Sequence, residues 1–497
     1  MQAPEYKILI TPLVSFLYIV LFTYAATSKL LNFEQFQAQL GQSPILTAFA
    51  DYTVWIIPIL EYGLALLLII PKYRLSGLIA SLGLMTAFTT YIFLILNFAD
   101  YIPCSCGGVL ENLSWKEHLF FNIGFLILAI IGITAQKTFI KISTRIKQLL
   151  LISVCSAGSV MLLFTVSDNR IRFNNSLIRI YPHHPVVFEK SIDLGYNSYY
   201  IAGINQKNIY LGNTTAPLHV LSVNRKRNDT THHTIHLPKN DSMAYRAIQL
   251  EIVQDQFLVA DGTVPVILLG DTLTWSTNQV VENLPHFSLS KAIDSNHVVF
   301  RYRDMNTNRD LIGTANLNVD NTLHMYNDLL QQQEDGVFST DGMLIYDHLA
   351  EQVVYVYYYR NEYVLANREL DLLHRGRTID TTAQAQLDIQ KINNTHSRKI
   401  SGIPRYVNKR SASYGNYLII NSEVLGKYDD TQMLKDAFII DVYDLSDHSY
   451  LLSFYLYKHG DGILKDIQIH GDQVIAIIGS HLNIYKMKKE YFSELKL

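Results

Sequence analysis

Cysteine is scarce in this sequence. Only three occur among 497 residues, and two of them, Cys104 and Cys106, are one residue apart. Three cysteines cannot build the kind of disulfide framework that stabilises small secreted domains. The spacing instead predicts one specific site at Cys104 and Cys106, with Cys155 as a bystander that packs inside an apolar segment.

An excess of positive charge is absent as well. The chain has 41 Lys and Arg against 44 Asp and Glu, a formal net charge of -3. We therefore expect no nucleic-acid partner. The motifs G-x-S-x-G and H-E-x-x-H and a phosphate-binding glycine loop are also missing. The cysteine pair is thus the main candidate for chemistry.

Long apolar runs are abundant up to about residue 166, and after it the chain becomes polar and rich in Tyr, Asn and Asp. Five runs approach or reach the roughly 20 residues needed to cross a bilayer. The first is too long for a signal-peptide core and predicts a retained helix. The five predicted spans are Ile8–Thr27, Val54–Ile70, Leu75–Asn97, Leu119–Ala135 and Leu149–Val166.

Loop charge predicts the topology of these spans. Lys72 and Arg74 lie between spans two and three, and residues 137–147 between spans four and five hold four more Lys or Arg. Residues 33–52 hold none, and the cysteine loop holds only Lys116. We therefore expect a multi-pass protein of the inner membrane, with a cytoplasmic N-terminus. The cysteine loop and everything after about Ser167 would lie on the outer, periplasmic side, where thiol pairs tend to become disulfides.

From Pro182 onward, short alternating runs of strand-forming residues are broken by Gly, Asn and Asp. Examples are "YYIAGINQKNIYLGNTTAPLHVLSV" and "LEIVQDQFLVADGTVPVILLG". Their starts recur roughly every 40 to 70 residues, which is typical of propeller blades. We predict an all-β propeller of about six blades, closed by the early strand Val186–Leu194; a pair of β-sandwiches is the main alternative.

These patterns predict a multidomain chain with three parts. Residues 1–136 form an all-α membrane domain of four helices. Residues 137–170 form a basic cytoplasmic loop and a fifth, connecting transmembrane helix. Residues 171–497 form the periplasmic propeller.

The cysteine pair has three interpretations. An accessible pair could exchange disulfides, because a C-x-C disulfide closes a small, strained and therefore oxidising ring. The following pair of glycines lets the backbone bend close to the sulfurs, and Cys106 lies nearer the expected start of the next helix. Two sulfurs are too few for a closed structural zinc site, so we predict no metal. The third interpretation is two inert cysteines in a loop.

Ser114 and Glu117 match a capping box, which predicts a helix that starts at this point. Trp115, His118 and Asn122 would then share one face behind the cysteines. His118 could move a proton during thiol exchange or hydrogen-bond a quinone carbonyl. Alternatively, Trp115 and His118 are ordinary anchors at the membrane interface.

Glu61 lies inside the second span, in "IPILEYGLALLLI". An ionisable group within a membrane is costly and suggests function by default. The carboxyl group could be neutral, or paired with Lys29 near the outer end of span one, or only structural. In the outer half, the histidines of "THHTIH" are expected to lie in surface loops.

Three fragments resemble a known family. "SKLLNFEQF", "PILEYGLALLL" and "CSCGG…WKEHLFFNI" make residues 8–135 similar to MauE/DoxX-type redox-associated membrane proteins. The resemblance implies a four-helix bundle like those of the vitamin-K-epoxide-reductase and DsbB types, with Cys104 and Cys106 as the redox pair. It also implies a role in disulfide formation in exported proteins. A quinone is the one cofactor to which the resemblance points, with Trp115 and Asn122 as its binding residues.

Two functions follow from these observations. In the first, the bundle is a thiol–disulfide oxidoreductase with catalytic residues Cys104, Cys106, His118 and Glu61, and the propeller recruits an exported client protein. In the second, the protein is not an enzyme. The propeller would then bind a protein or glycan in an envelope complex, and the helices would anchor it in the lipid bilayer.

Overall fold

The structure is a computed structural model of the chain, and it separates into two compact units. The helical unit comprises residues 1–183 and 426–429, and the β unit comprises residues 184–425 and 430–497. The residues that the structure describes are 6–33, 36–37, 40, 43, 45–46, 49–98, 114–136, 142–173, 176–238, 243–305, 307, 309–318, 323–326, 328–333, 337–387, 389–391, 398–400, 405–430, 432–458, 460 and 462–492.

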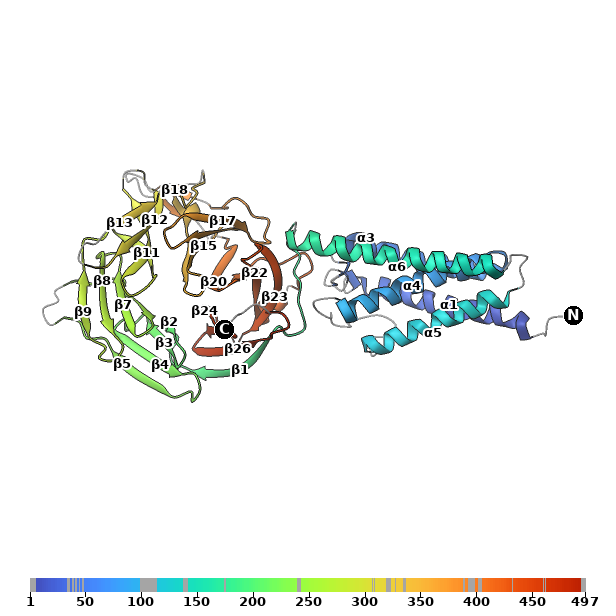
Figure 1. Ribbon diagram of the computed structural model, residues 1–497, viewed down its shortest axis with the longest axis horizontal. Helices are drawn as coiled ribbons and strands as arrows, with labels where there is room; N and C mark the ends of the chain where they lie inside the picture. The colour runs from blue at the N-terminus through green and yellow to red at the C-terminus, as the bar shows by residue number, and fades with distance from the viewer. Residues whose placement is uncertain are drawn as a thin grey trace. The chain divides into compact units, whose positions relative to one another are not determined.

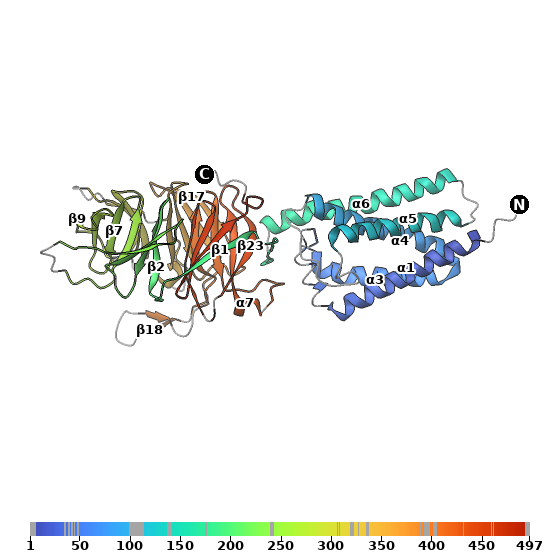
Figure 2. The same ribbon diagram turned by 90° about the horizontal axis from the view of Figure 1, so that it is seen from below.

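Five long helices form the described part of the helical unit, and they confirm the five predicted spans. Each contains an apolar stretch of 20 to 28 residues with a mean hydropathy of 1.8 to 2.3, enough to cross a bilayer core of about 30 Å. The short 3-10 helix η2 (Pro71–Tyr73) precedes α4, and the helices lie alongside one another (Figure 2). The five are α1 (Tyr6–Leu31), α3 (Ala50–Ile69), α4 (Arg74–Phe98), α5 (Trp115–Ala135) and α6 (Ile142–Phe173).

Helices α1 and α5 pack closely because a glycine lies at their contact. A Cβ atom at Gly132 would come within 3.0 Å of the Val14 side chain. Thr11 Oγ1 donates a hydrogen bond to the Gly132 carbonyl at 2.9 Å, and Tyr18 Oη donates to the Phe125 carbonyl at 2.7 Å. Small residues and hydrogen bonds between helices are the usual means of association in lipid, where the hydrophobic effect gives no preference for a protein neighbour.

Helix α6 presents most of its side chains outward, and only 6% of its most apolar stretch is buried. It packs on α4, where a Cβ atom at Gly83 would lie 3.0 Å from Ile152 Cγ2. Cys155 is exposed and forms no disulfide. The prediction that Cys155 is a packing residue was therefore wrong: an apolar helix that faces lipid has the same composition as a buried one.

The β unit is a propeller of six four-stranded blades, drawn as a ring in Figure 1. The first four blades follow chain order. They are β2 (Tyr199–Ile204), β3 (Asn208–Asn213), β4 (His219–Asn224), β5 (Thr230–Thr234); β6 (Gln249–Val253), β7 (Gln256–Asp261), β8 (Val266–Asp271), β9 (Thr277–Val281); β10 (Phe287–Ala292), β11 (His297–Asp304), β12 (Arg309–Asn316), β13 (Leu323–Tyr326); and β14 (Gly342–Asp347), β15 (Gln352–Tyr357), β16 (Glu362–Asn367), β17 (Leu372–Arg377).

The fifth blade follows a small hairpin outside the ring of blades. The short elements of this region are η3 (Val337–Thr340), the hairpin strands β18 (Ile389–Lys391) and β19 (Arg398–Ile400), and α7 (Met433–Asp436). The fifth blade consists of β20 (Asn408–Tyr414), β21 (Tyr417–Ser422), β22 (Ala437–Asp444) and β23 (Ser449–Tyr457).

The sixth blade closes the ring. Strands β24 (Leu464–His470), β25 (Gln473–Ile478) and β26 (His481–Met487) come from the end of the chain, and β1 (Val186–Asp193) supplies the fourth strand. β1 pairs antiparallel with β26 from Val186 opposite Met487 to Asp193 opposite His481. The predicted closure by Val186–Leu194 is confirmed. A closed ring of this kind leaves few exposed strand edges, which is the physical advantage of a propeller over an open sheet.

The blades hold together through apolar layers between neighbouring sheets. The central strand β21 is buried at all six positions, as expected for a strand covered on both faces. The tyrosine-rich run also packs inside, with Tyr355, Tyr357 and Tyr363 fully buried. Many turns begin at Asp or Asn: Asp271, for example, accepts hydrogen bonds from the backbone N–H groups of Leu273 and Thr274 in the turn that follows it. The sequence encodes these turns directly, because such side chains mimic a backbone turn.

Candidate functional site

The predicted redox pair, Cys104 and Cys106, lies outside the described residues. The description resumes at Ser114, which caps α5. Glu117 N donates to Ser114 Oγ at 3.4 Å, and Ser114 N donates to Glu117 Oε2 at 2.7 Å. The predicted capping box is therefore confirmed. It fixes the start of the helix that carries the remaining predicted site residues.

Trp115, His118 and Asn122 lie on the inner side of α5, as their spacing predicts. Asn122 is 3% exposed, and Trp115 and His118 are half-buried. The Trp115 ring lies 6.4 Å from the ring of Tyr91 on α4. Phe120, on the other side of the helix, is exposed. The inner face of α5 therefore presents an indole, an imidazole and an amide to the bundle.

Glu61 is paired with Lys29 inside the bundle. Lys29 Nζ lies 2.5 Å from Glu61 Oε1, and the side chains are 20% and 1% exposed. This confirms the pairing that the sequence offered as one alternative. The second carboxyl oxygen, Oε2, is buried without a hydrogen-bond partner among the described residues. A buried acceptor in this state fits a proton of its own or a donor from a bound molecule.

Lys29 is the centre of this polar cluster. Its Nζ lies 5.8 Å from the ring of Phe36 and 5.9 Å from the ring of Phe88 on α4, both within cation–π range. Lys29, Glu61 and Phe88 therefore bring α1, α3 and α4 to one place. Phe36 and Phe88 could not be singled out from the sequence, because one aromatic residue among many carries no signal.

Two hydroxyl contacts extend the polar region around the cluster. Thr27 Oγ1 and Tyr62 Oη are 2.8 Å apart. Thr27 lies two residues before Lys29, and Tyr62 directly follows Glu61. Ser43 Oγ lies 2.9 Å from Tyr91 Oη. In chemical terms the bundle offers a charged donor, a carboxyl group with one uncommitted oxygen and, on α5, a half-buried imidazole. Such a set can hold and pass protons within an apolar surrounding.

Two histidines of the run "THHTIH" lie in a strand, whereas the sequence predicts loops. His232 and His233 are in strand β5 and not in a loop. His232 Nδ1 is 2.9 Å from His219 Nε2, and His233 stacks on Trp275 with ring centroids 4.5 Å apart. Burial lowers the pKa of His233 below its usual range. The polar Thr and His run misled the prediction, because an outer blade strand exposes most of its side chains.

The helices and the propeller together define the class: a membrane-anchored β-propeller protein. Residues 7–135 match the family described as methylamine utilisation protein MauE, which confirms the resemblance seen in the sequence. The match spans α1 to α5, about a quarter of the chain, and includes none of the β unit.

Several solved structures resemble the chain. A DUF4221 family member from Bacteroides vulgatus has 11% identity and a TM-score of 0.42, over 61% of this chain and 97% of that one. The β-propeller domain of Myceliophteria thermophila Cps50 (Swd1) has 8% identity and a TM-score of 0.37, over 61% and 100%. Virginiamycin B lyase from Staphylococcus aureus has 10% identity and a TM-score of 0.36, over 60% of this chain and 99% of that one. At such low values none of these likenesses transfers a function. Comparison with curated proteins gave no match.

Proposed function

We propose that the chain is a membrane thiol–disulfide redox protein that supports disulfide formation in exported proteins, and that its propeller recruits the client. The main support is the buried Lys29–Glu61 pair of the helical unit, together with His118 in the first turn of α5, the helix that follows the segment with Cys104 and Cys106 in the sequence. A buried ion pair is expensive inside a membrane, and such groups mark functional sites.

The proposed reaction is a thiol–disulfide exchange. A client thiolate attacks one sulfur of a Cys104–Cys106 disulfide, which forms a mixed disulfide and releases the other cysteine as a thiolate. The second client thiol then attacks the mixed disulfide. The client leaves as a disulfide and the pair remains as two thiols. Two electrons and two protons have passed from the client to the pair.

Glu61 and His118 are the proposed proton carriers for this exchange. A thiol must lose its proton before it attacks, and a leaving thiolate must regain one. Lys29 would hold the Glu61 carboxyl through its Oε1, while Oε2 stays available for a proton. His118 would exchange protons at the half-buried start of α5.

The donors of this region suit a quinone. The ring N–H of His118 and the amide of Asn122 can donate to carbonyl oxygens beside the Trp115 indole, and Glu61 Oε2 can accept from a quinol hydroxyl. A quinone bound there would supply the acceptor for the two electrons and two protons that return the pair to its disulfide.

For the location we propose the inner membrane, with the N-terminus in the cytoplasm and the propeller on the outer side. The loop charges support this orientation, since Lys72 and Arg74 precede the third span and the cysteine loop is poor in Lys and Arg. The partners would be lipid and an exported client or another envelope protein.

Single serine substitutions test the proposal. Cys104→Ser and Cys106→Ser should each abolish client oxidation, and one of them should accumulate a mixed disulfide with the client. The mixed disulfide is detected on non-reducing gels and identified by mass spectrometry. Cys155→Ser, which changes an exposed cysteine of α6, is the matched control and should be active. Normal client oxidation by both variants would overturn the proposal.

A second candidate is a non-enzymatic anchor whose propeller binds a partner. The observation that favours it is a lysine-lined pocket in the fifth blade. In that case the serine variants still bind the partner, and substitutions in the pocket abolish partner binding.

A further inference from the structure

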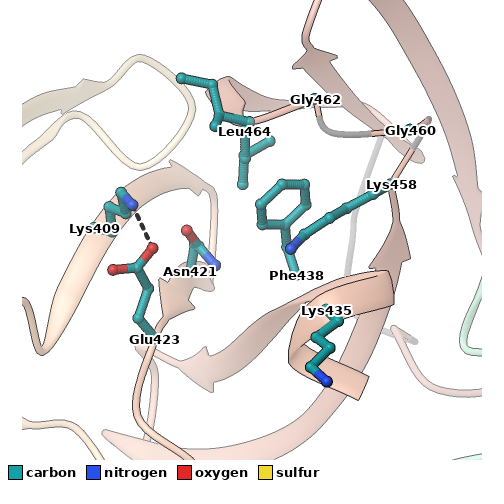
Figure 3. A pocket seen from close by; sticks show the side chains of 10 residues that line it. Lys409, Asn421, Glu423, Lys435, Phe438, Lys458, Gly460, Gly462 and Leu464 are labelled. Atoms are coloured by element: carbon teal, nitrogen blue, oxygen red, sulfur yellow. Dashed lines mark hydrogen bonds and ion pairs between the residues drawn. The ribbon is translucent and has the colours of Figure 1, made fainter. Parts of the chain in front are cut away.

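A pocket of about 240 Å³ lies at one end of the fifth blade, where β20, β22 and β24 begin and β21 and β23 end. Its lining comes from well-separated parts of the chain. Lys409 lies in β20, Asn421 in β21 and Phe438 in β22, and Lys458 follows β23. Figure 3 shows these side chains around one hollow.

Positive charge dominates this pocket. Lys409 pairs with Glu423, and both side chains are more than a third exposed. Lys458 Nζ donates to the Leu434 carbonyl at 2.7 Å and lies 5.0 Å from the centre of the Phe438 ring. Because an ammonium group has three donors, Lys458 keeps two for a ligand. Lys435 extends away along α7 at the rim in Figure 3, and adds a third positive charge there.

The remaining lining is apolar, with one buried amide. Phe438 and Leu464 form a wall, and Ile463 beside them is 62% exposed. Asn421 is 2% exposed, and its Nδ2 donates to the Ile439 carbonyl at 3.0 Å. Its Oδ1 has no hydrogen-bond partner in the described part of the chain, so a donor from a ligand would satisfy it.

We propose that this pocket binds an acidic segment of a partner polypeptide, in which a carboxylate side chain neighbours an apolar one. The carboxylate would contact Lys458, the apolar side chain would pack on Phe438 and Ile463, and a peptide N–H would reach the Asn421 amide. The cavity is smaller than the roughly 300–1,000 Å³ of typical small-molecule sites, which favours anchoring of part of a larger ligand. An inorganic anion would leave the apolar wall unused.

This inference rests on the proposed recruitment of a client by the propeller, and it names the chemistry of that client. Recruitment and thiol exchange can be separated experimentally. Binding in the pocket needs neither Cys104 nor Cys106, so the serine variants should bind the same peptide as the unchanged protein. If the unchanged protein exchanges thiols but does not bind the acidic peptide, only the pocket assignment is overturned.

The test is fluorescence polarisation with the full chain in lipid nanodiscs. The probe is a labelled peptide in which two glutamates flank a leucine, and its partner probe carries glutamines instead. We expect the acidic probe to bind at least about tenfold more tightly than the glutamine probe, because removal of the charges weakens contact with the lysines. The preference should shrink as salt is raised.

Two variants and a matched control locate the site. Lys458→Met keeps the apolar stem on Phe438, and Lys435→Glu reverses an exposed charge that no backbone contact depends on. Together they should weaken binding of the acidic probe by about tenfold. The control K207E/K226M makes the same two changes at exposed lysines of the first blade and should bind normally. An unchanged melting temperature excludes misfolding.

Three results would overturn the inference. The first is equal binding of both probes. The second is that K435E, K458M and the double variant all bind the acidic probe as tightly as the unchanged protein does. The third is displacement of the acidic probe by inorganic phosphate at an equal concentration of charge, which would identify a small-anion site.

Discussion

Removal of either partner of the Lys29–Glu61 pair should destabilise the helical unit strongly. In Lys29→Met the Glu61 carboxyl, 1% exposed, loses the ammonium group that lies 2.5 Å away. Loss of one partner of a buried ion pair typically costs about 3–5 kcal/mol, because the other charge is left buried alone. Replacement of both by apolar residues of similar size, in K29M/E61L, should restore the free energy of unfolding to within about 1 kcal/mol.

The free energy of unfolding can be measured by titration of the detergent-purified chain with a denaturing detergent. Far-ultraviolet circular dichroism at the helical band reports mainly on the helical unit, because the described helices of the β unit, η3 and α7, have four residues each. Lys72→Met is the matched control, an exposed lysine at a helix end in the same unit, and should cost less than about 1 kcal/mol. The buried pair has been misassigned if K29M lowers the free energy of unfolding no more than K72M does. The same holds if K29M/E61L loses as much of this free energy as the two single substitutions added together.

Two further predictions concern packing and pH. Gly132→Ala should lower the thermal midpoint of the helical unit, because its Cβ atom would meet Val14 at 3.0 Å, whereas Gly124→Ala in the same helix has open space and should be neutral. In the β unit, burial and the charge of Arg225 lower the pKa of His470 from 6.5 to about 4. The unfolded chain therefore binds this proton more readily, and the melting temperature should fall as the pH drops from 6.5 to 4. The fall should be smaller in H470Q, and an equal fall in both proteins would contradict the assignment.

Features set by local sequence could be predicted. The spans follow from length and hydropathy, the capping box from Ser114 and Glu117, and the ring closure from an unpaired strand at Val186. The pairing of Lys29 with Glu61 was foreseeable because charged residues within a bilayer seek each other.

Features set by the meeting of distant segments could not be predicted. Phe36 and Phe88 surround Lys29 only after α1 and α4 have packed. Lys409 and Lys458 line one pocket only because two blade strands begin and end at the same edge. The outward face of Cys155 depends on which side of α6 meets α4, and an evenly apolar helix does not encode that side.

The redox state of Cys104 and Cys106 decides whether the protein is a thiol–disulfide redox protein. Membranes that contain the Cys155→Ser protein are equilibrated across a series of thiol–disulfide buffers, and free thiols are then alkylated with a reagent that adds mass. We expect both cysteines to change together, from two alkylated thiols in reducing buffer to none in oxidising buffer. We also expect depletion of membrane quinone in cells to shift the pair toward thiols. If alkylation of the pair stays the same in every buffer, and in membranes with and without quinone, Cys104 and Cys106 are not a redox pair.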